Sequence, residues 1–123
     1  MARILVIDDN DEFRDIIRRW LEDGGYEVVE AVNGEEGIKR YREKPADIVI
    51  ADIIMPKKEG IETMMELKRD FPDVKIIAVS GGGVVDPRDY LEGAKLIGGA
   101  TRTFAKPFKR EELLKAITEL LAG

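Results

Sequence analysis

The chain of 123 residues contains no cysteine. It therefore has no disulfide bonds, which fits a reducing compartment. It also has no apolar run close to the roughly 20 residues that a membrane-spanning helix needs. The apolar run after Arg3 ends at Asp8 and is too short for a signal peptide. We therefore expect a cytoplasmic protein without a membrane partner.

Basic residues are fewer than acidic residues. The chain has 20 Lys and Arg against 25 Asp and Glu, for a net charge of −5. Nucleic-acid-binding domains usually carry a basic face, so we expect no direct nucleic-acid partner. The sequence shows no internal repeat, low-complexity tract or linker, and its length leaves no room for a second domain. Residues 1–123 are therefore predicted to form one domain, large enough to need no disulfide or structural metal.

Short apolar runs alternate along the chain with segments of helical periodicity. The runs are nearly continuous, as expected for strands of a parallel sheet that helices cover on both faces. Strand and helix patterns in alternation indicate five βα units and an α/β fold. Asn33 is predicted to cap the second helix, and Asp86 with Pro87 to begin the fourth. The predicted strands are residues 4–7, 26–31, 48–51, 76–79 and 103–105, and the predicted helices have apolar residues within 13–21, 38–41, 61–65, 90–97 and 113–121.

Five polar side chains stand at the ends of predicted strands. Asp8 and Asp9 follow the first strand, Asp52 and Ser80 follow the third and fourth, and Lys106 follows the fifth. In an open parallel sheet, ligands bind in the crevice beyond the carboxyl ends of the strands. Folding is therefore predicted to gather three carboxylates, a hydroxyl and an ammonium in one pocket. Such a group is suited to a divalent cation and a phosphoryl group.

Each of these signals also has a purely structural interpretation. One Asp of the Asp8-Asp9 pair could cap the following helix, and Asp52 could form a turn. Ser80 begins a glycine-rich turn, and Lys106-Pro107 is an ordinary way to enter a helix. Their joint placement at one edge of a sheet favours the functional interpretation.

The motifs resemble the receiver domain of two-component response regulators over the whole chain. The residues that carry the resemblance are Ile7-Asp8-Asp9-Asn10, Ala51-Asp52, Met55-Pro56 with Gly60, Val79-Ser80-Gly81, and Gly99-Ala100 through Lys106-Pro107-Phe108. The resemblance implies a flavodoxin-like doubly wound sheet of five parallel strands in the order 2-1-3-4-5, with five flanking helices. This strand order is taken from the resemblance, because the periodicities alone do not determine it.

The resemblance also implies the chemistry of the pocket. Close carboxylates repel one another, and Mg²⁺ (or Mn²⁺) relieves that repulsion because it prefers oxygen ligands. Asp9 and Asp52 would be direct ligands, with Asp8 acting through water and the carbonyl of Ile54 as a further ligand. Asp52 would accept the phosphoryl group, and Lys106 and Ser80 would bind its oxygens. The Lys106-Pro107 bond would be cis.

Histidine is absent from the chain, so the chain cannot supply a phosphohistidine. The resemblance therefore implies a histidine kinase, a phosphotransfer protein or a small phosphodonor as the source, and an unidentified downstream protein as the target. The output face would comprise the fourth helix, the fifth strand and the fifth helix, around Thr103 and Ala105. A stand-alone receiver is the first expectation, and a piece of a longer regulator is the alternative.

The sequence departs from the family in two places. The switch position three residues before Lys106, usually aromatic, is Thr103, and strand alternation puts Phe104 on the other face, with Lys106. Three glycines, Gly81 to Gly83, follow Ser80. They form either a plain connection or a loop whose N–H groups approach the phosphoryl group. Gly81 is thus a third expected switch residue, with Ser80 and Thr103.

Two other functions compete with the phospho-acceptor. Hydrolases that form an aspartyl phosphate place a second Asp two residues after the nucleophile, where this chain has Ile54. A degenerate receiver would only dock a partner, and it would have lost at least one of three features: a member of the acidic pair Asp8-Asp9, the acceptor Asp52, or Lys106. All of these are present, so we expect a signalling module that catalyses only its own phosphorylation and dephosphorylation.

Overall fold

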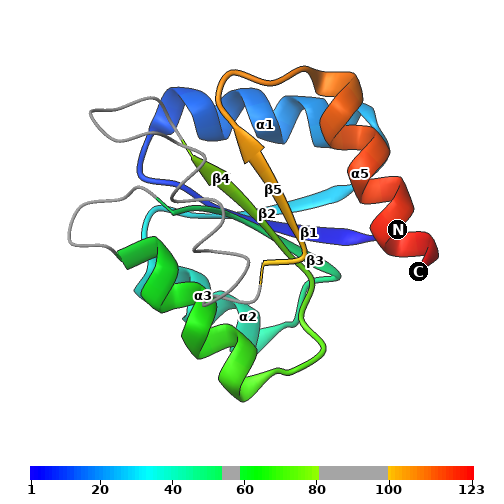
Figure 1. The fold of residues 1–123 in the computed structure, drawn as a ribbon. Helices are drawn as coiled ribbons and strands as arrows, with labels where there is room; N and C mark the ends of the chain where they lie inside the picture. The colour runs from blue at the N-terminus through cyan, green and yellow to red at the C-terminus, as the bar shows by residue number, and fades with distance from the viewer. Residues whose placement is uncertain (54–58, 81–99) are drawn as a thin grey trace.

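The computed structural model describes residues 1–53, 59–80 and 100–123, which form one parallel sheet with helices on both faces (Figure 1). The five strands lie in the order β2-β1-β3-β4-β5, as expected for the doubly wound fold. The predicted fourth helix, within residues 87–97, lies outside the described residues. The strands are β1 (Arg3–Ile7), β2 (Glu27–Ala31), β3 (Ile48–Asp52), β4 (Ile76–Ser80) and β5 (Arg102–Ala105), and the helices are α1 (Asp11–Asp23), α2 (Gly34–Glu43), α3 (Glu59–Asp70) and α5 (Arg110–Ala122).

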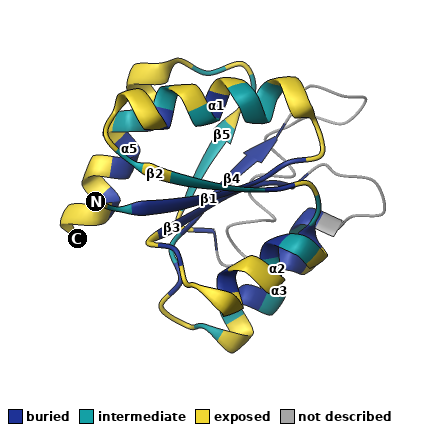
Figure 2. Cartoon of the chain, turned by 180° about the vertical axis from the view of Figure 1, so that it is seen from behind, coloured by how far each residue is buried: buried dark blue, intermediate teal, exposed yellow. Residues whose placement is uncertain are grey.

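The helices form two layers around the sheet. Helices α1 and α5 cover one face, and α2 and α3 cover the other (Figure 1). Strands β1, β3 and β4 are buried at every position, which explains their uninterrupted apolar sequences. Alternate residues of β1 enter different cores: Ile4 and Val6 pack toward α1 and α5, and Leu5 and Ile7 toward α2 and α3. Figure 2 shows the inner strands in the dark blue of buried residues and the outward faces of the helices in the yellow of exposed ones.

Three residues that helical spacing assigns to the apolar, inward faces of helices are exposed in the structure. Ile16, Met65 and Leu121 have relative exposures of 45%, 45% and 36% and do not belong to the core. Helical spacing predicts which residues share a side of a helix, and packing against the sheet decides where the buried stripe ends.

None of the described helices is long and apolar enough to cross a membrane.

Asparagine side chains begin the two helices nearest the amino terminus. The side chain of Asn10 accepts a hydrogen bond from the Phe13 N–H at 3.0 Å, and that of Asn33 accepts one from the Glu36 N–H at 2.8 Å. The predicted cap at Asn33 is confirmed. Because Asn10 caps α1, the structural interpretation of Asp8 or Asp9 as the cap is wrong.

A glycine allows α3 to approach the end of β3 closely. A Cβ atom at Gly60 would lie 2.2 Å from the carbonyl oxygen of Asp52 and 2.5 Å from Cα of Ile53. Only a residue without a Cβ fits against main chain at that distance. Gly60 therefore sets the position of α3 relative to Asp52.

Candidate phosphoryl-acceptor and metal site

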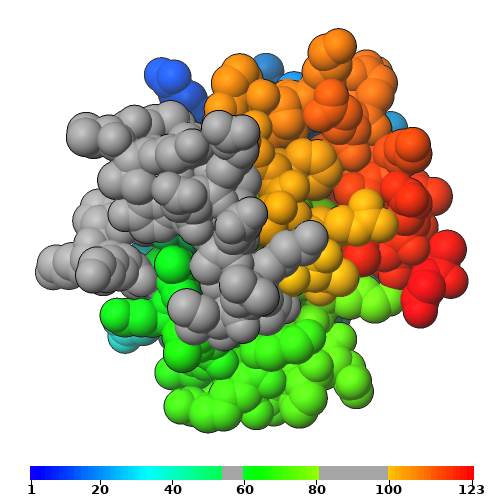
Figure 3. Space-filling model, in the orientation of Figure 1, coloured from blue at the N-terminus to red at the C-terminus, as the bar shows by residue number. Residues whose placement is uncertain are grey.

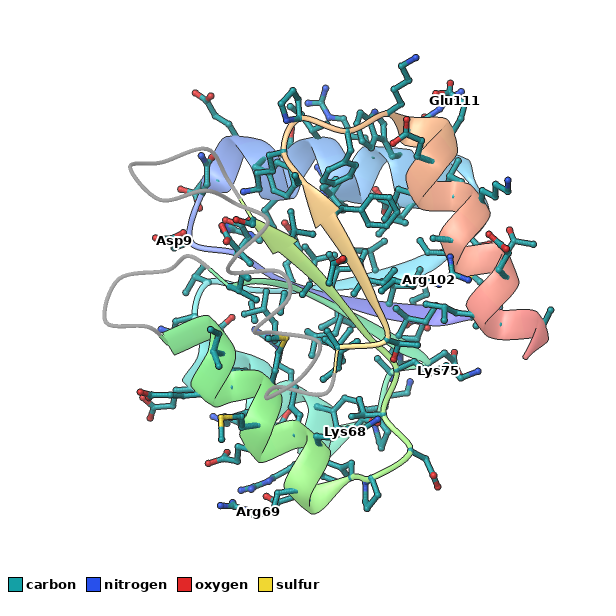
Figure 4. The ribbon with its side chains drawn as sticks, viewed as in Figure 1. Asp9, Lys68, Arg69, Lys75, Arg102 and Glu111 are labelled. Atoms are coloured by element: carbon teal, nitrogen blue, oxygen red, sulfur yellow. The ribbon has the colours of Figure 1, made fainter. Side chains whose placement is uncertain are left out.

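The parallel register brings the carboxyl ends of four strands to one edge of the sheet. Ile7 pairs with Ala51, Asp52 with Val79, and Ser80 with Ala105. The residues that follow these pairs, Asp8 and Lys106, therefore emerge beside Asp52 and Ser80. Figure 4 shows Asp9 at this edge, and Lys75 and Arg102 toward the other end of the strands.

Three carboxylates converge at this edge. Asp8, Asp9 and Asp52 each offer an oxygen, and the three oxygens lie within 4.8 Å of one another. Asp8 and Asp52 are buried, with 1% and 6% exposure, whereas Asp9 is exposed. Burial makes their mutual repulsion more costly, and oxygen donors at this spacing suit Mg²⁺, which keeps several water ligands. The donor set therefore fits Mg²⁺, and the exposed side of the site at Asp9 would leave room for water ligands. Ile54, expected to contribute a carbonyl, lies outside the described residues.

The ammonium of Lys106 balances part of this negative charge. Its Nζ atom lies 3.1 Å from Oδ2 of Asp8 and 3.2 Å from Oδ2 of Asp52. The same nitrogen lies 3.7 Å from the centroid of the Phe13 ring, a cation–π contact. Two carboxylates and an aromatic face thus hold the ammonium directly beside Asp52. The Lys106-Pro107 peptide bond is cis, as the resemblance implies.

The residue that follows β5, Lys106, is joined to the last residue of β4, Ser80. The Lys106 N–H donates to the carbonyl oxygen of Ser80 at 2.7 Å. Ser80 is fully buried at the last position of β4. The structure thus brings Asp8, Asp9, Asp52 and Lys106 together, and it places Ser80 one residue beyond the register partner of Asp52.

The expected departure at β5 is visible in the side-chain packing. Phe104 packs toward α1 and α5, and its ring lies 5.2 Å from that of Phe108. Lys106 is on the same side, since it contacts Phe13 of α1. The prediction that Phe104 shares a face with Lys106 is therefore confirmed. Thr103 pairs with Ala78, which belongs to the opposite core. Gly81, the remaining expected switch residue, lies outside the described residues.

Two residues that contact the site were not predicted from the sequence. Phe13 lies under the lysine ammonium, and Arg14 donates from Nη1 to the carbonyl oxygen of Asp8 at 2.8 Å. Burial lowers the pKa of Arg14, but its hydrogen bond with Asp11 and the charges of Asp11 and Glu30 outweigh burial and leave that pKa raised. Phe13 and Arg14 both lie in the first turn of the helix that follows the Asp-Asp pair, and this position is the sequence signal that could have identified them.

The fold and this pocket define a doubly wound α/β domain with an acidic centre beyond its strand ends. The sequence pattern of the response regulator receiver domain matches residues 4–118. The chain belongs to this family. Receiver domains are modules of two-component signalling that bind Mg²⁺ at an acidic pocket and interact with histidine kinases or phosphotransfer proteins; they are not enzymes of the usual kind.

Similar proteins include both short and long regulators. The chain is 38% identical to the response regulator GacA of Pseudomonas viridiflava over 125 residues, which is 100% of this chain and 56% of GacA. It is 34% identical to the chemotaxis protein CheY of Thermotoga maritima over 119 residues, or 96% of each protein. A crystal structure of a receiver domain protein from Clostridium thermocellum has a TM-score of 0.89 at 32% identity, and covers 99% of this chain and 95% of that one. The chain thus spans about half of GacA and nearly all of CheY.

Proposed function

We propose that Asp52 is the phospho-acceptor of this receiver domain and that residues 1–123 act as one signalling unit. The observation that carries the proposal is the contact of Lys106 Nζ with both Asp8 and Asp52, beside a third carboxylate from Asp9. The arrangement combines a nucleophilic oxygen, a place for a divalent cation and a cation for the incoming oxygens. Phosphoryl transfer needs little more than such positioning and charge neutralisation.

In the proposed reaction, a carboxylate oxygen of Asp52 attacks the phosphorus atom of the donor. An O–P bond to Asp52 forms as the donor's bond to phosphorus breaks, and the bonding electrons leave with the donor's nitrogen or oxygen. Lys106 exchanges its contact with Asp52 for one with a phosphoryl oxygen, for which a compact charge on a flexible chain is suited. The Ser80 hydroxyl binds another oxygen. Asp8, Asp9 and Asp52 would hold Mg²⁺, together with the carbonyl of Ile54, and the ion supplies further neutralisation of the phosphoryl group.

The proposed donor is a histidine kinase or a histidine phosphotransfer protein. The absence of histidine from the chain supports an external source. Catalysis is limited to phosphorylation and dephosphorylation of the chain itself, because the nucleophile is one of its own side chains. The cysteine-free composition supports a cytoplasmic location.

The proposed output is a change in a protein interface. Phosphorylation adds about −1.5 to −2 charge at neutral pH and can bias an element that has two arrangements. Ser80, Gly81 and Thr103 are the proposed switch residues. Atoms of β5 reach the surface beside α5 (Figure 3), where a partner can contact Ala105, which is exposed. A chemotaxis role like that of CheY and a role within a longer regulator like GacA both agree with the similarities found.

The first test is intact mass spectrometry after incubation with acetyl phosphate and Mg²⁺. The wild-type protein should gain one phosphoryl group, and the Asp52→Asn variant should gain none. Omission of Mg²⁺ is the control for metal dependence. If the wild-type protein gains no adduct and also fails to bind a beryllofluoride mimic, the phospho-acceptor proposal is wrong and a docking module is the better description.

A further inference from the structure

The side chain of Arg14 lies behind the acidic loop and connects three segments of the chain. Its Nη1 donates to the main-chain carbonyl of Asp8 at 2.8 Å, in the loop between β1 and α1. Its Nε donates to Glu30 of β2 at 3.1 Å, and its Nη2 donates to Asp11 in the first turn of α1 at 2.6 Å. The side chain is only 13% exposed. A planar guanidinium carries five N–H donors on three nitrogens and so reaches acceptors in several fixed directions, whereas the three donors of a lysine all lie on one nitrogen.

The charge of Arg14 is already balanced by its own partners. Asp11 and Glu30 supply two carboxylates to the one guanidinium, and Arg18 shares Glu30 at 3.7 Å. Arg14 therefore brings little net positive charge to the metal pocket. Its contribution there is geometric, because it holds a main-chain carbonyl.

The carbonyl that Arg14 holds belongs to the peptide group between Asp8 and Asp9. The N–H of Asp8 is fixed separately, by donation to the carbonyl oxygen of Ala31 at 3.1 Å, and one carboxylate oxygen of Asp8 accepts from the Asn10 N–H at 2.8 Å. Rotation of the Asp8–Asp9 peptide group would swing the exposed Asp9 carboxylate relative to Asp52. The Arg14 hydrogen bond opposes that rotation.

We infer that Arg14 is a positioning residue for the Mg²⁺ site, acting through the peptide group that joins Asp8 and Asp9, two of its acidic residues. The inference rests on the proposed metal site. Mg²⁺ requires near-ideal octahedral geometry, so even a small displacement of Asp9 weakens binding. Groups that hold metal ligands in place typically contribute roughly 10- to 100-fold to metal affinity.

The test is isothermal titration of the metal-free protein with Mg²⁺, repeated with Mn²⁺, for wild type, Arg14→Met and Arg18→Met. Arg18 is a matched control: it lies one turn further along α1 and forms ion pairs with Asp15, Glu22 and Glu30. Its described hydrogen bonds go to Asp15 and Glu22 and not to the acidic loop. Arg14→Met should raise the Kd for Mg²⁺ roughly 10- to 100-fold, and Arg18→Met should leave it within about two-fold.

The inference is overturned if Arg14→Met lowers the melting temperature without changing the Kd, or if both variants weaken Mg²⁺ binding equally. Either result would give Arg14 a purely structural role. If Arg14→Met does not fold, Arg14→Lys is the second variant, because it keeps the charge and loses the planar guanidinium. It should still weaken Mg²⁺ binding, and a wild-type Kd for this variant would overturn the inference. If the wild-type protein binds no Mg²⁺, the proposed metal site is wrong and the inference is wrong with it.

Discussion

Substitution of Gly60 by alanine sets two physical effects against each other. Alanine is the better helix former by roughly 1 kcal/mol, so propensity alone predicts a more stable α3. The added methyl group would, however, lie 2.2 Å from the Asp52 carbonyl oxygen and 3.0 Å from the Asp52 carbonyl carbon. Ordinary contacts begin at 3.4 Å, and the difference, 3.4 − 2.2, requires a displacement of about 1.2 Å. Both contacts are with main chain, so rotation of a side chain cannot relieve them.

We therefore expect the clash to prevail. Overpacking of a filled site costs about 1–3 kcal/mol, and the upper part of this range applies here because main chain cannot move aside as a side chain can. After subtraction of the propensity gain, the net loss is about 1–2 kcal/mol. For a domain of this length, that loss corresponds to a fall in melting temperature of roughly 3–8 °C. A misplacement of about 1 Å at a reacting group costs on the order of 100-fold in rate, so phosphorylation of Asp52 should slow by roughly 10- to 100-fold.

The assay combines thermal unfolding with the rate of phosphorylation by acetyl phosphate. Gly37→Ala is the matched control. Its Cβ would lie 2.3 Å from the side chain of Ile7, and the main chain of Asp52 is not among the atoms it would meet. It should lower stability while leaving the rate close to that of the wild type. Gly123→Ala, with its nearest neighbour at 3.6 Å, should change neither quantity. A Gly60→Ala protein that is as stable and as rapidly phosphorylated as the wild type would refute the close-approach argument.

Three further predictions concern charge. Lys106→Met should bind Mg²⁺ roughly ten-fold more tightly in titrations, because an ammonium near the ion weakens its binding by about 1–2 kcal/mol. The same variant should be phosphorylated about 10²- to 10³-fold more slowly, because it lacks the cation for the phosphoryl oxygens. Phe13→Leu removes a cation–π contact of about 0.5–2 kcal/mol and should slow phosphorylation by roughly 2- to 30-fold. The pKa of Asp70 is lowered by hydrogen bonds from Arg69 and then Arg42. The carboxylate therefore stabilises the fold fully above its unfolded pKa of about 4, and that stabilisation is lost as the pH falls through the lowered pKa of the folded state. Asp70→Asn should be slightly less stable than the wild type at pH 7, and in thermal scans this difference should shrink steadily as the pH is lowered below about 4.

Controls for these predictions are available in the same chain. Phe104→Leu removes a ring that packs beside Phe108 on the same side of the sheet, and it tests whether a loss of rate in Phe13→Leu comes from general loosening of that core. Weaker Mg²⁺ binding in Lys106→Met would contradict the repulsion argument. A stability difference at Asp70 that does not shrink as the pH falls below about 4 would show that the carboxylate's charge is not responsible.

Much of the fold could be predicted because its inner strands are apolar without interruption. A strand such as β3, buried on both faces, leaves a pattern of consecutive Ile, Val and Ala that a surface helix cannot have. The strand order came from family resemblance, since apolar periodicity does not say which strands are neighbours. Exposed positions such as Ile16 and Met65 were assigned to helix faces because the period of a helix does not reveal the width of its contact.

The polar residues of the site could be predicted from their place at strand ends, but their supporting contacts could not. Asp8, Asp52 and Lys106 follow apolar runs, and parallel topology then brings them together. The contacts of Phe13 with Lys106 and of Arg14 with Asp8 depend on side-chain directions fixed by packing of α1 on the sheet. The position of both residues in the first turn of α1 marks them as neighbours of the site, but spacing does not say which of its atoms their side chains contact.

The aromatic packing beside the pocket gives the protein an intrinsic optical probe. Trp20 is the single tryptophan of the chain, and its ring lies 6.2 Å from that of Phe108, which in turn lies 5.9 Å from Phe13. Phe13 carries the ammonium of Lys106 on its face. Tryptophan emission responds to the packing and polarity around the indole, and here all of it comes from one known position, with the rings of Phe108 and Phe13 between the indole and Lys106. We expect Mg²⁺ binding and phosphorylation to change this emission, which would let both be followed in real time on the unlabelled protein.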